Sequence, residues 1–331
     1  MRACTVGPKI GGGNPNLNQS TGQREYIKRI INQCEEIFGG LPKEYTSPID
    51  KDDHPKLDTT DEVGEDQIKH YQSLIGAFQW CISLGRYDIY CATMAMGRFW
   101  AAPKSGHLKH LQWICGYLKK YPDGAVRFCT GIPDYSHLDH ITYDWVYSVY
   151  GASQEELPFG MPTPQGKAVW TATFEDANLL QDFVTGRSVT GILHLVNQSP
   201  AAWFCNLQNS IKTATCGSEF VAARLATEQI MDLCYTLRML GVSLDGKAYM
   251  FGDNQSVIST SSTIPHSSLN KCHNALSYHQ VREAIASGVL WFFHIPGTEN
   301  PADVLTKFCG HAVFWPLIKP FIFWRGEPFK L

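Results

Sequence analysis

Four acidic residues in the second half of the sequence stand where carboxylates could act together. Asp176, Glu219, Asp253 and Asp303 are separated by 43, 34 and 50 residues, so only folding could bring them close to one another. Carboxylates that converge repel one another unless a cation lies between them, and oxygen-only ligands favour Mg²⁺ or Mn²⁺ over zinc. Two such ions about 3.5–4 Å apart could hold the attacking and leaving oxygens of a phosphodiester cleavage.

Each acid taken singly also has an explanation without chemistry. Glu219, near the start of a predicted helix, would be stabilised by the helix dipole alone. Asp253 could close a turn, and any of the four could be a cap or a solvated surface group. Residues 168–331 contain only 12 acids, however, and these four open or close segments that are otherwise apolar. The set of four therefore favours a metal site more than any one member does.

The elements that would position these acids follow an α/β pattern. Strand-like runs lie at 168–174, 191–196, 201–205, 247–251 and 289–295. Helical patterns lie at 217–240, 273–287 and 301–308. Asp176 follows the first strand and Asp253 the fourth, while Glu219 and Asp303 stand near helix starts. The order predicts one mixed five-stranded sheet with flanking helices, in which 168–174 lies beside 247–251.

The first half of the sequence predicts a different organisation. Residues 1–25 are rich in Gly, Asn and Pro and are expected to be a flexible head. Residues 26–130 carry helical periodicity, and Asp88 is expected to cap the helix that starts at Ile89. Residues 131–167 have no steady periodicity and are expected to be a linker. We place an α/β domain at 168–310 and a C-terminal tail at 311–331.

Composition excludes several classes of protein. The chain has 331 residues, of which 44% are hydrophobic and 18% charged, which argues against a wholly disordered chain. No apolar run reaches the ~18 residues of a membrane helix, and the first residues carry no secretion signal, so we expect no membrane partner. Eleven cysteines without a C-x-x-C pair indicate reduced thiols. The formal charge of −3 argues mildly against a nucleic-acid partner.

Ordered motifs argue the other way. They are EDAN at 175–178, TGRSVTG at 185–191, ATCGSEF at 214–220, FGDNQS at 251–256, KCHNA at 271–275 and PGTENPADVLTK at 296–307. Upstream stand DHPKLD at 53–58, YQSLIG at 71–76 and GRYDI at 85–89. In this order and spacing, the motifs resemble the C-terminal reverse transcriptase and ribonuclease H region of copia-type retrotransposon Pol polyproteins, from about residue 26 onward.

The resemblance implies a ribonuclease H-like sheet preceded by a small helical unit like a reverse transcriptase thumb or connection. Asp176, Glu219, Asp253 and Asp303 match the family's four metal-binding acids, which implies catalysis with two Mg²⁺ or Mn²⁺ ions. The implied partners are an RNA–DNA hybrid and the rest of the polyprotein. The implied location is intracellular, in the cytoplasm within a virus-like particle and also in the nucleus. The expected contacts to the hybrid backbone are Arg187, Asn254, Gln255, Asn274 and Asn300.

The sequence also departs from the family's pattern. The loop position at which cellular relatives carry a mobile histidine falls near Thr298, and nearby His294 is expected to make a structural hydrogen bond. Basic residues expected at 205–208, 272 and 280 are replaced by CNLQ, Cys272 and Gln280. The polymerase tetrapeptide Tyr-x-Asp-Asp is absent from the sequence, so we expect no DNA synthesis by this chain alone.

Two alternatives to a hybrid-cutting nuclease stay open. The missing basic residues favour a decayed, non-enzymatic module that binds nucleic acid or a partner subunit, whereas the four intact acids favour the enzyme. A strand transferase of related fold is disfavoured, because the helix-borne Glu219 comes second and a fourth acid, Asp303, comes last.

Overall fold

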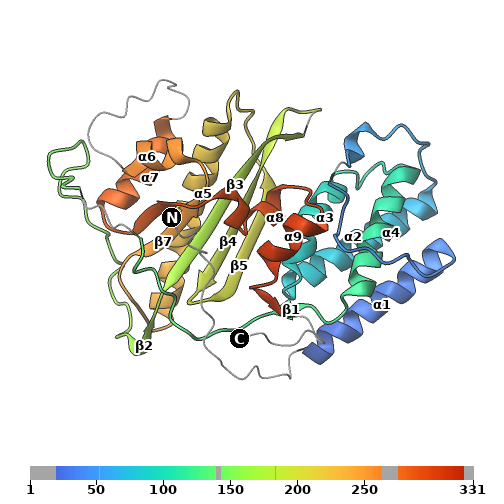
Figure 1. The fold of residues 1–331 in the computed structure, drawn as a ribbon, viewed down its shortest axis with the longest axis horizontal. Coiled ribbons are helices and arrows are strands. Elements are labelled where there is room, and N and C mark those ends of the chain that lie inside the picture. Colours follow the sequence, from blue (N-terminus) through green and yellow to red (C-terminus); the bar gives the residue numbers. More distant parts are fainter. Residues whose placement is uncertain (1–19, 52, 139–142, 183, 263–274, 324–331) are drawn as a thin grey trace. The chain divides into compact units, whose positions relative to one another are not determined.

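The computed structural model describes residues 20–51, 53–138, 143–182, 184–262 and 275–323 (Figure 1). The described chain divides into two compact units. One unit contains residues 128–138, 143–181, 185–262 and 275–303, and the other contains residues 20–127, 182, 184 and 304–323, apart from residue 52. No helix among the described residues is long and apolar enough to cross a membrane.

The first unit is built on a five-stranded sheet with strand order β5-β4-β3-β7-β8. The strands are β3 (Thr171–Asp182), β4 (Arg187–Val196), β5 (Ser199–Leu207), β7 (Ala248–Gly252) and β8 (Leu290–His294). β3, β7 and β8 run parallel, and β4 pairs antiparallel with β5. Ala172, Thr173 and Phe174 pair with Tyr249, Met250 and Phe251, so the expected neighbours are adjacent. The predicted mixed five-stranded sheet with flanking helices is confirmed.

Helices pack on this sheet, and the apolar side chains between the helices and the strands form the core of the unit. The helices of this unit are α5 (Thr215–Met239), α6 (Gln255–Ser262), α7 (Ala275–Ala286) and the start of α8 (Asp303–Thr306). Alanines and Ile230 on α5 pack with Met250 of β7, Phe292 of β8 and Val281 of α7 in one apolar cluster. In Figure 1, α5 runs along the strands of the sheet. A second, two-stranded sheet joins β2 (Gln165–Val169) in parallel to β6 (Val242–Leu244).

The second unit is mainly helical. Its helices are α1 (Ser20–Phe38), α2 (Glu65–Ser83), α3 (Tyr90–Gly97), α4 (Ser105–Lys120) and α9 (His311–Ile318). Apolar residues at helical spacing form its core, among them Ile30, Leu74, Phe78 and Leu111. The helical unit expected before the sheet is therefore present.

The last described residues are part of this helical unit. Phe314, Leu317 and Ile318 of α9 are buried, and β9 (Ile322–Phe323) pairs antiparallel with β1 (Ala125–Val126). The domain boundaries expected at residues 25, 130, 167 and 310 stay a prediction. The contacts nevertheless group residues 304–323 with the helices that precede the sheet.

Three local expectations were wrong. β3 does not end at residue 174 but continues to Asp182, because it goes on toward the β4 hairpin after leaving β7. α5 begins at Thr215, which places Glu219 in the second turn, where the dipole argument weakens. Asp88 does not cap α3, since its side chain is buried and binds Arg86 instead.

Candidate metal centre

Three of the four predicted acids come together beside β3 and β7, which are adjacent interior strands of the sheet. Asp176 lies on β3 just beyond its paired segment with β7, Asp253 directly follows β7, and Glu219 lies on α5. One carboxylate oxygen from each lies within 4.8 Å of the other two. The side chains of Asp176 and Glu219 belong to residues only 1% and 4% exposed, so neither is the solvated surface group or cap that each could have been singly.

The donor set fits hard divalent cations. Carboxylate oxygens at Mg–O distances of about 2.0–2.1 Å can lie up to ~4.2 Å apart around one ion, and a second ion about 3.5–4 Å away extends that span. Separations of at most 4.8 Å therefore fall within the span of a pair of ions and lie close to the limit for a single ion. Buried carboxylates this close together also need a compensating positive charge. The residues present consequently fit the metal site that the sequence predicts.

A fifth acid lies beside this group. Glu175 is 1% exposed, and its Oε2 has no hydrogen-bond partner among the described residues. Burial, together with the charges of Asp176 and Asp253, raises the pKa of its carboxyl well above the ordinary value. The sequence patterns included Glu175 only as the first residue of the EDAN motif. The signal that could have found it is a pair of adjacent acids that the neighbouring apolar residues place inside a sheet.

Asp303 is not part of the group of three. It begins α8 and is buried, but its carboxylate lies outside the set of oxygens within 4.8 Å of one another. The loop before it is tied to the sheet through Asn300, whose Nδ2 donates to the Glu175 carbonyl oxygen at 2.9 Å. Asn300 Oδ1 also accepts from the Ala302 amide at 3.1 Å. The position of Asp303 thus depends on a buried asparagine.

The residues expected to contact the hybrid differ in their exposure and in their hydrogen bonds within the protein. Asn300 is fully buried, so both ends of its amide serve the protein rather than a ligand. Asn254 Oδ1 accepts from the Val257 amide and so caps α6, while Gln255 is exposed at the start of that helix. Arg187 Nη2 donates to Asn209 Oδ1 at 3.4 Å on a partly exposed strand end. Asn274 lies outside the described residues. Their contacts to a substrate stay a prediction.

The loop between β8 and α8 approaches Asp253 closely. A Cβ at Gly297 would lie 2.9 Å from Asp253 Oδ2, so the glycine gives that carboxylate room. His294 Nε2 donates to the Asp253 carbonyl oxygen at 3.1 Å, which is the structural hydrogen bond expected of it. Thr298 is exposed in the same loop.

Two of the positions that lack a basic residue are used inside the protein. Gln208 is buried, and its Nε2 donates to Thr190 Oγ1 and to the Ser218 carbonyl oxygen. Gln280 Nε2 donates to Glu228 Oε1 at 3.0 Å. Cys272 lies outside the described residues. Neither glutamine supplies the positive charge that a phosphate contact would need.

Comparison with known proteins agrees with this reading of the sequence. The chain is 26% identical over 292 residues to the retrovirus-related Pol polyprotein from transposon TNT 1-94 of Nicotiana tabacum, a match that covers 86% of this chain and 19% of the relative. It is 22% identical over 293 residues to that from transposon RE1 of Arabidopsis thaliana, which covers 88% of this chain and 17% of the relative. The chain is similar to copia-type retrotransposon Pol polyproteins over most of its length.

The same comparisons define what part of such a polyprotein is present. The chain spans less than a fifth of the length of these two curated relatives. No family model matches the sequence. Among solved structures, the N-terminal ribonuclease H domain of a Mycobacterium tuberculosis protein, fused to maltose-binding protein, aligns with a TM-score of 0.33 at 13% identity, over 46% of this chain and 98% of that one.

Proposed function

We propose that this chain is a metal-dependent endonuclease that cleaves the RNA strand of RNA–DNA hybrids, as part of a retrotransposon reverse transcriptase. The observation that supports this most is the convergence of Asp176 on β3, Glu219 on α5 and Asp253 just after β7, which are far apart in the sequence. The mixed sheet and the similarity to Pol polyproteins also support the proposal, because the family resemblance implies this chemistry.

The protein's own residues would hold the reacting groups in place. Asp176 and Asp253 follow the paired segments of the adjacent parallel strands β3 and β7, and Glu219 lies on α5, so carboxylate oxygens come from three parts of the fold. His294 fixes the backbone of Asp253 through its carbonyl oxygen. When bound, two Mg²⁺ or Mn²⁺ ions would supply an acidified water and stabilise the leaving 3′-oxygen.

Substrate selection in this proposal rests on shape. A hybrid is distinguished by the width of its minor groove and by the 2′-hydroxyls of one strand rather than by base sequence. The exposed Gln255, two residues after Asp253, and the partly exposed Arg187 are the side chains we propose for contacts to a sugar–phosphate backbone. With few basic residues near the site, we expect weak substrate binding and a high substrate requirement.

The test is incubation of the protein with an RNA–DNA hybrid labelled on its RNA strand. We expect shortened RNA products with Mg²⁺ or Mn²⁺, none with excess EDTA, and none from the same RNA unpaired. An intact labelled strand at every metal concentration would reject the nuclease.

One observation favours a second candidate. Gln208 and Gln280 make hydrogen bonds within the protein at positions where relatives tend to be basic. A non-catalytic module that binds hybrid or a partner subunit would tolerate such changes. It would show salt-sensitive hybrid binding without any product in the same assay.

A further inference from the structure

Two stacks of rings lie on the helical unit, and one hydrogen bond links them. Trp113 of α4 stacks on Tyr45 with ring centroids 3.7 Å apart. Trp315 of α9 stacks between His311, at 5.7 Å, and Tyr121, at 5.8 Å. His311 Nδ1 donates to the Thr46 carbonyl oxygen at 3.0 Å, which joins the two stacks. We call Trp113, Tyr45, His311, Trp315 and Tyr121 the aromatic row.

Lysines accompany this row along its length. Lys43 Nζ lies 5.9 Å from the centre of the Tyr45 ring, and Lys120 and Lys319 lie 5.8 Å from the Tyr121 and Trp315 rings. All three lysines are exposed, and the rings other than exposed His311 are half-buried. Residues 43–46, 113–121 and 311–319 together contain four lysines and one acid, although the whole chain has a net charge of −3.

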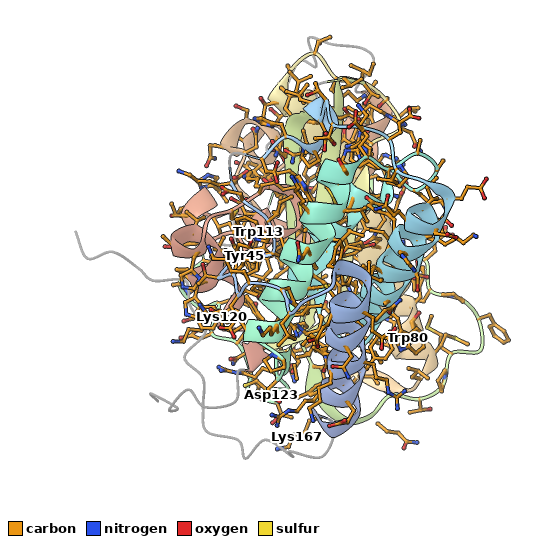
Figure 2. The ribbon with its side chains drawn as sticks, turned by 90° about the vertical axis from the view of Figure 1, so that its right-hand side faces the viewer. Tyr45, Trp80, Trp113, Lys120, Asp123 and Lys167 are labelled. Atoms are coloured by element: carbon orange, nitrogen blue, oxygen red, sulfur yellow. The ribbon has the colours of Figure 1, made fainter. Side chains whose placement is uncertain are left out.

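Specific hydrogen bonds and one close backbone approach hold the first stack of rings in place on α4. Lys119 Nζ donates to the Pro42 carbonyl oxygen and Trp113 Nε1 donates to the Ser47 carbonyl oxygen, so both anchor the 42–47 loop on α4. A Cβ at Gly116 would clash with the Lys43 carbonyl oxygen, so the loop can approach α4 only over a glycine. In Figure 2, Tyr45, Trp113 and Lys120 lie along one side of α4, and Trp80 lies on the other side of the view.

From this surface we propose that the helical unit binds single-stranded nucleic acid on the aromatic row, independently of the carboxylate group. Aromatic rings with solvent-accessible surface stack on bases of any sequence, and lysines beside them match the charge of the phosphate backbone. A protein partner with an acidic surface would use the lysines but has no bases to stack. The presence of a lysine beside three of the five rings therefore favours a single strand.

The test measures binding of the full chain to a fluorescein-labelled 20-nucleotide oligo(dT) and to oligo(U), with EDTA present. Changing Lys43, Lys120 and Lys319 together to Gln should weaken binding by about tenfold or more at low salt. It should also flatten the dependence of log affinity on log salt concentration by ~2, because each phosphate contact of a single strand contributes ~0.7. Trp315→Ala should weaken binding by about fivefold or more through lost stacking. The tryptophan fluorescence of the wild-type chain should be quenched on binding.

Matched controls separate this surface from general charge and from the acids. Lys28, Lys69 and Lys167 changed together to Gln remove the same charge elsewhere, and Trp80→Ala removes an exposed tryptophan on α2. Both controls, and Asp176→Asn, should bind the oligonucleotide like the wild type. The binding test therefore keeps its meaning even if the chain cleaves no hybrid. Thermal melting confirms that each variant is folded.

Three results would overturn the inference. They are equal affinity of the lysine variant and its control, tighter binding to a blunt DNA duplex than to the single strand, and self-association of the chain in sedimentation that the lysine variant abolishes. The last result would assign the surface to a second copy of the chain instead.

Discussion

Arg86 and Asp88 form an ion pair that is fully removed from water. Arg86 Nε and Nη2 donate to the Asp88 carboxylate, Nη1 donates to the Tyr121 carbonyl oxygen, and the Tyr117 hydroxyl donates to Asp88 Oδ2 at 2.8 Å. A buried pair need not add net stability over an apolar pair, but removal of one partner leaves an uncompensated charge. The GRYDI motif therefore joins the start of α3 to the end of α4.

We predict that Asp88→Ala lowers the free energy of unfolding by about 3–5 kcal/mol. The matched control is Asp66→Ala, which removes an exposed pair with Lys69 and should change stability by no more than about 0.5 kcal/mol. Urea unfolding followed by circular dichroism measures both. Equal effects of the two variants would show that the buried network contributes nothing special.

Two histidines near the start of α4 have pKa values that their surroundings shift in opposite directions. His107 Nδ1 accepts from the Lys104 amide, which leaves Nε2 to donate to the Pro55 carbonyl oxygen. His110 Nδ1 donates to the Gly106 carbonyl oxygen, and Nε2 lies 2.6 Å from Asp53 Oδ2. Burial would lower the pKa of His110, but the nearby Asp53 carboxylate and the Gly106 carbonyl oxygen outweigh it and raise the pKa.

The raised pKa of His110 predicts how its contribution to the free energy of unfolding changes with pH. A group whose folded-state pKa is raised stabilises the fold below its unfolded pKa, about 6.5 for His, and loses that contribution as the pH rises through the folded value. The difference in unfolding free energy between wild type and His110→Gln should therefore shrink from pH 6 toward pH 9. The depressed pKa of His107 acts in the opposite direction and is common to both proteins. A difference that grows with pH would contradict the assignment.

At the scale of elements, the loop from β8 to α8 depends on one amide. The Asn300 side chain binds both the Glu175 carbonyl oxygen and the Ala302 amide from a fully buried position. It ties the residue before Asp176 to the loop that carries Asp303. Because unpaired buried polar groups are costly, this loop should not keep its position without the amide.

Asn300→Ala should lower the free energy of unfolding by about 1–3 kcal/mol and reduce hybrid cleavage by more than the stability loss explains. Thr298→Ala changes an exposed side chain in the same loop and serves as the control. Cleavage rates at saturating hybrid, measured below the melting temperature of both variants, decide the matter. Full activity in a folded Asn300→Ala protein would show that the position of this loop does not matter for cleavage.

The elements that sequence patterns revealed are those with a strong period. Helix α5 and strands β7 and β8 were predicted within about two residues at each end, because their apolar residues recur regularly. β3 was predicted too short, since Glu175 and Asp176 interrupt the apolar run that a strand interior normally shows. α9 was missed because it contains Pro316, which sequence rules read as a helix breaker.

Contacts distant in sequence set the limit for the site as well. Spacing pointed to Asp176, Glu219 and Asp253, because each stands near the end of a run of apolar residues with a recognisable period. It could not reveal that Asn300 is buried under Glu175, or that Asp88 binds Arg86 and not a helix end. Both depend on partners that no local window contains.

At the scale of the whole molecule, the helical unit includes residues from both ends of the described chain. Phe314 of α9 is 2% exposed and packs edge-on against Tyr117 of α4 at 6.0 Å. Phe314→Ala should lower the free energy of unfolding by about 3–5 kcal/mol, whereas Val313→Ala, at an exposed neighbour, should change it by less than about 0.5 kcal/mol. Denaturant unfolding of the full chain compares them. An unaffected Phe314 variant would mean that α9 does not stabilise this unit.

Hybrid cleavage by the Asp176→Asn variant, compared with cleavage by Asp232→Asn, tests whether the three converging acids form a catalytic metal site. Asp176→Asn keeps the size of the side chain but removes a charged metal ligand from the group of three, while Asp232→Asn makes the same chemical change at an exposed position of α5. We predict that the first variant loses cleavage by orders of magnitude with its fold intact or slightly more stable, because carboxylate repulsion falls. The second should cleave like the wild type. Equal metal-dependent cleavage by both variants would show that cleavage does not need the Asp176 carboxylate.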